Sequence, residues 1–195
     1  MSHPVQYHVE LPDRYSRLTA FFRLILVIPH AIVAALWGLV AYLATIVAWF
    51  AIVITGRNPL WSFSAAMIRY YGRVVGYQML VANTFPPFNG DDPYTINVTI
   101  DQPDGHNRLT TFFRIIMIIP AAILQYILGQ VANLVGIIQW LIIVFTASCP
   151  EGLAQFQVTC QRYTVRTLAY GLLLTDRYPN FDADATPSAA EAPAW

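Results

Sequence analysis

Apolar positions fall into two long uninterrupted stretches of the chain. Residues 24–55 and 115–149 contain no Lys, Arg, Asp or Glu. Each stretch exceeds the ~20 apolar residues that cross the hydrocarbon core of a bilayer as a helix. The first is not typical of a cleaved signal peptide, because it lacks a short basic start and a small-residue cleavage site. The pattern therefore predicts an integral membrane protein.

The composition supports this class. The chain is 56% hydrophobic and only 11% charged, whereas soluble chains carry about 25% charged residues. Its formal net charge is zero, every cation is arginine, and no run of basic residues marks a stripe for phosphate binding. The lipid bilayer is therefore the expected partner, and nucleic acid is not.

The chain contains one unit twice. A shift of 91 residues lays the segment Arg17 to Arg23 on the segment Arg108 to Arg114. After a two-residue insertion the shift becomes 93 and continues until Phe88 meets Phe181. Self-similarity at a fixed period indicates structural repeats. We assign residues 5–88 to a first membrane repeat, 96–181 to a second membrane repeat, and the Ala-, Pro- and Asp-rich segment 182–195 to a disordered tail.

Each repeat carries two further elements besides its apolar stretch. Alternating apolar and polar residues at 5–9 and 96–100 predict two short strands, which could pair with each other. Segments 60–81 and 153–174 show the helical period and predict an amphipathic helix in each repeat. Both helices carry arginines near the middle, where crossing hydrocarbon is costly, so we expect them to lie at the membrane interface.

The long apolar stretch allows two arrangements. A continuous helix over residues 18–55 would measure about 57 Å, far longer than a ~30 Å hydrocarbon core. A break at Pro29 and Pro120 would leave one long tilted span per repeat. A turn near Gly38 and Gly129 would instead make a transmembrane helical hairpin in each repeat, and four membrane segments in all.

Two observations favour the hairpin. Polar residues gather around the middle of the second stretch, where a single span would bury them at mid-depth; they are Gln125, Gln130 and Asn133. A hairpin also leaves every arginine on one face, which agrees with the positive-inside tendency and predicts a multi-pass protein with cytoplasmic termini. A single span per repeat would instead relate the repeats by inverted topology, as in some transporters.

The chain resembles a known family at several motifs. They are Phe22-Arg23-Leu24 with Ile28-Pro29-His30, Thr55-Gly56-Arg57-Asn58-Pro59, and Leu173-Leu174-Thr175-Asp176-Arg177-Tyr178-Pro179. These motifs are similar to those of the bacterial membrane proteins of domain of unknown function 4389, in both repeats. The repeats differ from each other, with Ala121 where His30 stands and Asn83 opposite Asp176. The resemblance implies a bacterial plasma membrane and supplies no activity, cofactor or catalytic residue.

The arginines of the amphipathic helices are the best candidates for a binding site. Arg69 and Arg73 lie one helical turn apart, as do Arg162 and Arg166. Such guanidinium pairs suit lipid phosphates or the carboxylates of a partner; the alternative is interfacial anchoring. His30 is an ionisable residue at membrane depth, which marks a functional site, or else a neutral imidazole that hydrogen-bonds a carbonyl freed by Pro29.

We therefore expect an all-α integral membrane protein of two tandem repeats, each with a short strand, a transmembrane helical hairpin and an interfacial amphipathic helix. No nucleophile and base occur in a recognisable pattern, and we expect no enzyme activity, cofactor or metal. The predicted function is that of a membrane module binding anionic lipid or a membrane protein partner, with homo-oligomers as a further expectation. The alternative is a small transporter or channel component.

Overall fold

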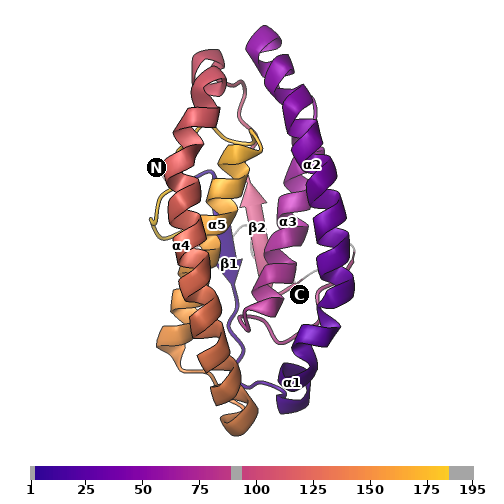
Figure 1. Cartoon of the computed structure of the whole chain (residues 1–195), viewed down its shortest axis with the longest axis vertical. Helices are drawn as coiled ribbons and strands as arrows, with labels where there is room; N and C mark the ends of the chain where they lie inside the picture. The colour runs from indigo at the N-terminus through magenta and orange to yellow at the C-terminus, as the bar shows by residue number, and fades with distance from the viewer. Residues whose placement is uncertain (1–2, 89–93, 185–195) are drawn as a thin grey trace, which may run out of the picture.

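The computed structural model describes residues 3–88 and 94–184 of the chain (Figure 1). Its helices and strands follow in the order β1 (Val5–Val9), α1 (Arg17–Leu26), α2 (Ile28–Thr55), α3 (Trp61–Gln78), β2 (Ile96–Ile100), α4 (Arg108–Thr146) and α5 (Glu151–Gly171). The two predicted strands are therefore present, and helices α3 and α5 occur where the sequence predicted an amphipathic helix in each repeat. The repeats differ in one respect, because the segment that α1 and α2 form in the first repeat is the single helix α4 in the second.

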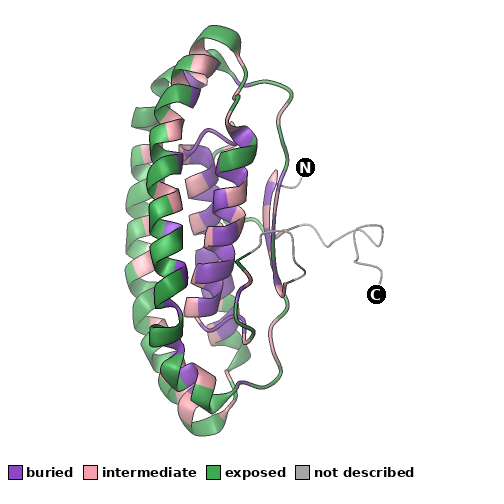
Figure 2. Ribbon diagram, turned by 90° about the vertical axis from the view of Figure 1, so that its right-hand side faces the viewer, coloured by how far each residue is buried: buried purple, intermediate pink, exposed green. Residues whose placement is uncertain are grey.

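The elements form three layers, which Figure 2 shows edge-on. Helices α2 and α4 make an outer layer whose far side is exposed, α3 and α5 make a buried middle layer, and the two strands lie beyond them. Helix α3 contacts α2 of its own repeat, and α5 contacts α4. The core sits between the middle helices and the sheet, where the buried side chains include Ile68, Val98 and Val165.

The two strands pair, as the sequence allowed. They are antiparallel, with Val5 opposite Ile100 and Val9 opposite Ile96. Val5, Tyr7 and the apolar residues of β2 are buried on the inner face. Gln6 and Asn97, on the alternate face, are less covered, as expected for a half-buried sheet.

The middle helices do not lie on a free surface. Buried residues occur all around α3, because α2 covers one side and the sheet covers the other. Glycines permit this close approach: a Cβ at Gly76 would lie 2.3 Å from Cδ1 of Ile96 and 2.5 Å from the hydroxyl of Tyr7. The prediction that α3 and α5 lie at a membrane interface is therefore not confirmed.

The hairpin prediction is wrong. Helix α2 continues through Gly38, and α4 continues through Gly129. A glycine inside a helix costs only about 1 kcal/mol relative to alanine, too little to end a helix that keeps its other backbone hydrogen bonds. Gly38 serves packing instead, since a Cβ there would lie 2.9 Å from Cε of Met67 in α3.

Proline acts differently in the two repeats. In the first, α1 ends at Leu26 and α2 begins at Ile28 with Pro29 in its first turn, a position that suits proline. In the second, Pro120 lies inside the continuous helix α4. Each repeat therefore has one long apolar helix in place of a hairpin, but the break that the alternative expected at both prolines occurs in the first repeat and not in the second.

The two repeats run in opposite directions. Nε1 of Trp49, near the end of α2, donates to the carbonyl of Thr111 at the start of α4 over 3.0 Å. The matched Trp140, near the end of α4, donates to the carbonyl of Ala20 in α1 over 2.9 Å. Helices α2 and α4 are therefore antiparallel, as Figure 1 shows.

The close approach at Gly76 predicts a difference between two glycine variants. Gly76→Val should lower the free energy of unfolding by about 1–3 kcal/mol, because Ile96 and Tyr7 must move. Gly129→Ala is the matched control, since no atom lies within 4 Å of its Cβ position, and it should be neutral or stabilising. Unfolding followed by circular dichroism in mild detergent measures both. Equal stability of Gly76→Val and the parent chain would contradict the packing.

Candidate functional site

An arginine of the second repeat joins two layers. The guanidinium carbon of Arg114 in α4 lies 4.3 Å from the ring centroid of Tyr170 in α5. Its Nη1 donates to the carbonyls of Tyr170, over 3.0 Å, and Thr175, over 2.6 Å. Carbonyls at a helix C-terminus lack intrahelical donors and carry the negative end of the helix dipole. Arg114 therefore caps α5 while it anchors α4.

Arg23 repeats this arrangement in the first repeat. It lies 4.3 Å from the ring centroid of Tyr77, at the end of α3. Its Nη1 donates to the carbonyls of Tyr77, over 2.7 Å, and Ala82, over 2.8 Å. Arg23 is 1% exposed and Arg114 is 2% exposed. The fold thus encloses two matched cations at opposite ends of its long axis.

Arg114 has a carboxylate partner. Asp176 accepts a hydrogen bond from Nη2 of Arg114 and one from the backbone N–H of Asn107, and lies 3.0 Å from Nδ1 of His106. Burial alone would raise the pKa of Asp176, but the hydrogen bonds with His106 and Asn107 and the charge of Arg114 outweigh it and lower the pKa to about 2. The Asp176 carboxylate is therefore ionised and compensates the buried guanidinium.

Arg23 lacks the equivalent partner. Asn83 stands at the position of Asp176 and accepts from the backbone N–H of Ser16 over 3.4 Å. Within residues 3–88 and 94–184, Arg23 forms no ion pair, and its Nε and Nη2 have no hydrogen-bond partner. A buried charge without a counter-charge is costly. The two repeats therefore share geometry but differ in electrostatics.

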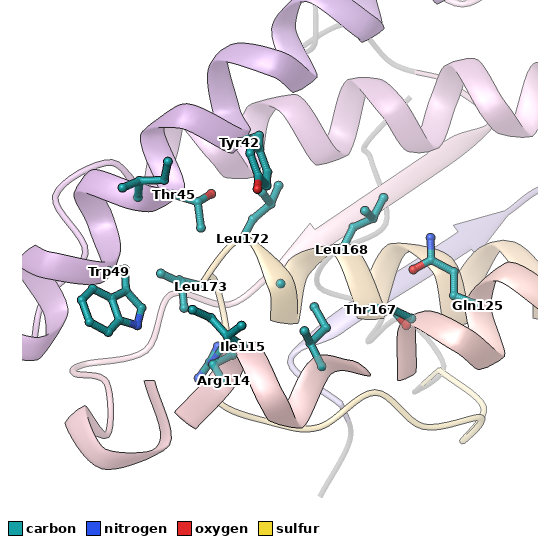
Figure 3. Close-up of a pocket in the computed structure, with 14 residues that line it drawn as sticks. Tyr42, Thr45, Trp49, Arg114, Ile115, Gln125, Thr167, Leu168, Leu172 and Leu173 are labelled. Atoms are coloured by element: carbon teal, nitrogen blue, oxygen red, sulfur yellow. The ribbon is translucent and has the colours of Figure 1, made fainter. Parts of the chain in front are cut away.

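Each arginine lines a pocket between helices of the two repeats. The Arg114 pocket measures about 560 Å³ and is formed by α2, α4 and α5, whose side chains converge in Figure 3. The Arg23 pocket measures about 360 Å³ and lies between α1, the end of α3, and α4. The lining positions of the two pockets correspond under the repeat shift. In the Arg114 pocket, Thr45, Ile46 and Trp49 match residues of the Arg23 pocket, namely Gly136, Ile137 and Trp140.

The predicted pair Arg162 and Arg166 lies inside the fold. Nε of Arg162 and Nη2 of Arg166 each lie 2.7 Å from a carboxylate oxygen of Asp184. Arg166 is fully buried and also donates to the carbonyls of Val5 and Asp182. The chain's own C-terminal segment therefore occupies this pair. The first three residues of the predicted tail, 182–184, take part in the fold, while 185–195 lie outside the described residues.

The predicted pair of the first repeat has a different setting. Arg73 is buried, and its guanidinium carbon lies 5.8 Å from the ring centroid of Tyr94, while Arg69 is half-buried. Lipid or partner binding by these four arginines stays a prediction.

His30 is enclosed by aromatic side chains. Its Nδ1 lies 2.7 Å from the hydroxyl of Tyr70, and its ring stacks on Phe88 with centroids 4.0 Å apart. In the second repeat, where Ala121 replaces His30, Phe181 stacks on the ring of Tyr163 instead, at 4.5 Å. Nδ1 thus pairs with a tyrosine hydroxyl and not with a backbone carbonyl. A functional role of His30 stays a prediction.

Arg23 and Arg114 were not among the predicted site residues, although the sequence contains a signal for them. Arg23 and Arg114 occupy the same place in the two copies of the most similar motif, directly before the apolar stretches. The difference between Asn83 and Asp176 was visible as well. The contact between Arg114 and Asp176 was not visible, because it joins residues 62 positions apart.

Comparison with known proteins gives one result. The family model described as "Domain of unknown function (DUF4389)" matches residues 17–89 and 108–182. No curated protein and no solved structure matches the chain. The two matched ranges correspond to the two repeats that the internal shift predicted.

The Asp176 cluster predicts a pH-dependent contribution to stability. Its folded-state pKa of about 2 lies below the usual carboxyl value of 3.8, so its stabilisation is present above pH ~4 and is lost as pH falls from ~4 to ~2. Asp176→Asn should therefore lower the free energy of unfolding by roughly 2 kcal/mol at neutral pH, because Arg114 loses its partner. The free energy of unfolding of Asp176→Asn should also change less than that of the parent chain between pH ~4 and ~2.

Chemical unfolding over a pH series, in mild detergent, measures this effect. Asn83→Asp is the mirror variant and should stabilise the chain at neutral pH by giving Arg23 a carboxylate. An Asp176→Asn variant as stable as the parent chain at pH 7 would refute the assignment.

Proposed function

The chain belongs to the DUF4389 family, as two tandem copies, and we propose that it is a non-enzymatic membrane protein that lies within one leaflet of a bacterial plasma membrane and binds anionic lipid. The observation that carries the proposal is the apolar face of the outer layer. Helices α2 and α4 are long and apolar enough, by length and composition, to cross a membrane. Their arrangement in the fold favours lying along it.

The outer layer presents an apolar face over its whole length. Only a narrow line of α2 is buried, consisting mainly of small residues such as Ala34, Ala41 and Ala48. Large apolar side chains point away from the fold; Leu36 is 61% exposed and Phe145 is 74% exposed. Soluble monomers rarely expose apolar patches beyond a few hundred Å². The hydrocarbon of a bilayer would cover such a face, and this supports the proposed membrane position.

The sheet favours a membrane position parallel to the surface. Helix α4 has 39 residues and a length of about 58 Å, against a ~30 Å hydrocarbon core. The sheet lies beside the middle of the long helices (Figure 1). If these helices crossed the bilayer upright, the sheet's open edges would lie at mid-depth, where unpaired backbone groups cost several kcal/mol each. Lying flat keeps the sheet on the water side.

This position also keeps the charges on one side without hairpins. Exposed arginines occur near both ends of the outer layer, namely Arg14, Arg17, Arg57 and Arg108. We call them the rim arginines. With the long helices lying flat, all four lie at headgroup depth on the same side, which the positive-inside tendency makes the cytoplasmic side. Their charges would then attract anionic phospholipids.

The alternative function is a small transporter or channel component, in which α2 and α4 cross the membrane. One observation favours it: α2 and α4 are antiparallel, so if both crossed the membrane the repeats would have the inverted topology that many transporters use. Partner proteins and homo-oligomers fit either function. The position of the rim arginines separates the two.

Cysteine labelling tests the membrane position. With Cys149 and Cys160 replaced by alanine, single cysteines at Arg17 and Arg57 should both resist a membrane-impermeant maleimide added to intact cells, and both should react after permeabilisation. Crossing helices would place the two positions on opposite sides. Labelling of exactly one of them from outside would therefore refute the flat arrangement and support the transporter alternative.

Lipid content tests the role of the rim arginines. Changing all four to Gln should lower the ratio of phosphatidylglycerol to phosphatidylethanolamine that co-purifies in mild detergent severalfold, because each arginine near an anionic surface contributes about 1 kcal/mol. Mass spectrometry of the extracted lipids measures the ratio. The double variant Arg69→Gln with Arg162→Gln is the control, and it tests whether helices α3 and α5 bind the lipid. An unchanged ratio in the rim variant, with loss in the control, would move the lipid site to those helices.

A further inference from the structure

We propose that the Arg23 pocket binds an acyl amphiphile with an anionic head, either a fatty-acid carboxylate or a lipid phosphate. The head would pair with Arg23, and the chain would lie in the groove between α1 and α4. This inference rests on the proposed function only for the source of the ligand, because the surrounding leaflet would supply it. It deepens that function by naming a specific site within the fold.

The guanidinium of Arg23 supplies the first argument. It is 1% exposed, lines the pocket, and leaves Nε and Nη2 without partners among the described residues. A buried guanidinium stabilises a protein only when a counter-charge and hydrogen-bond acceptors meet it. A carboxylate or phosphate has oxygen acceptors in the geometry that guanidinium donors prefer. An oxoanion is therefore the chemistry that Arg23 lacks.

The lining of the pocket supplies the second argument. Most of the wall is apolar and is contributed by Leu24, Leu80, Ile137 and Trp140, with Gln78 and Asn133 as the uncharged polar residues. The volume of about 360 Å³ falls within the ~300–1,000 Å³ typical of small-molecule sites. A free inorganic ion would leave this apolar wall without contacts. An acyl chain would cover it.

The matched pocket of the second repeat supplies the third argument. It has the same placement and a corresponding lining, but its arginine is already paired with Asp176. An anion there would meet a carboxylate as well as a guanidinium, so the Arg114 pocket would not favour charged heads. The same chain thus contains an anion-accepting pocket and a compensated copy of it.

The experiment measures retention of added amphiphiles by delipidated protein in neutral detergent, using native mass spectrometry. Palmitate and lysophosphatidylglycerol test the carboxylate and phosphate arms, and methyl palmitate gives an uncharged head on the same chain. The parent protein should retain at least one of the two anionic probes at least tenfold more strongly than methyl palmitate. Asn83→Asp should abolish this preference by giving Arg23 an internal counter-charge. Asp176→Asn should create a second anionic site.

A second pair of variants keeps the test independent of charge changes. Ile137→Trp fills the Arg23 pocket from an exposed position on α4 and should reduce anion retention. Ile46→Trp fills the matched pocket and should leave it unchanged. Equal retention of palmitate and methyl palmitate, unchanged retention in both Asn83→Asp and Ile137→Trp, or binding of inorganic phosphate with no gain from an acyl chain would each overturn the proposal.

The outcomes separate this inference from the membrane position. Labelling at Arg17 and Arg57 reports on the flat arrangement and does not depend on the charge at position 83. If the labelling result holds and the anion preference is absent, the protein lies flat without a ligand at Arg23. If anion retention holds and the labelling shows crossing helices, the pocket survives and the flat arrangement does not.

Discussion

The capping of a helix end by a buried arginine is the interaction on which the arrangement of layers depends. In each repeat, one buried guanidinium stacks on a tyrosine ring and donates hydrogen bonds to carbonyls at the end of the middle helix. One end of the apolar segment, formed by α1 and α2 in the first repeat and by α4 in the second, is thereby fixed against the middle helix. Small residues along the buried line of α2 then allow close packing over the rest of its length. The exposed apolar face follows from this attachment.

Much of the fold could be predicted from local pattern. The repeat shift located both units, and the period of apolar residues alone located the strands and the helices α3 and α5. The prediction of hairpins is wrong, because Gly38 and Gly129 do not form turns. The intact backbone hydrogen bonds of a helix outweigh the cost of one glycine. The predicted interfacial position of α3 and α5 is not confirmed, for a related reason: a helix with arginines on one side resembles a surface helix until the partner that covers that side is known. Here the cover is the sheet and Asp184, both distant in sequence.

The candidate site was less predictable than the fold. Arginine pairs at helical spacing drew attention to Arg162 and Arg166, which the structure uses to hold its own C-terminal segment. Arg23 and Arg114 stood at the edge of apolar stretches, where an arginine normally reaches toward headgroups. Their burial depends on which segments fold back over them, and no local pattern contains that information. Only the difference between Asn83 and Asp176 in aligned repeats pointed to unequal charge.

The exchange of strands between repeats has a consequence for how such a chain can evolve and fold. Strand β1 lies on α5 of the other repeat, and β2 lies on α3, so neither repeat encloses a core by itself. The contact of Arg166 with Val5 must wait until 161 further residues have been synthesised, and contacts of such separation form slowly. Two separate copies could make the same contacts as a symmetric pair, but a mutation would then alter both arginine sites at once. When the copies are joined in one chain, each arginine site can change without the other. One molecule can then hold a neutralised cation at one end and an uncompensated cation at the other.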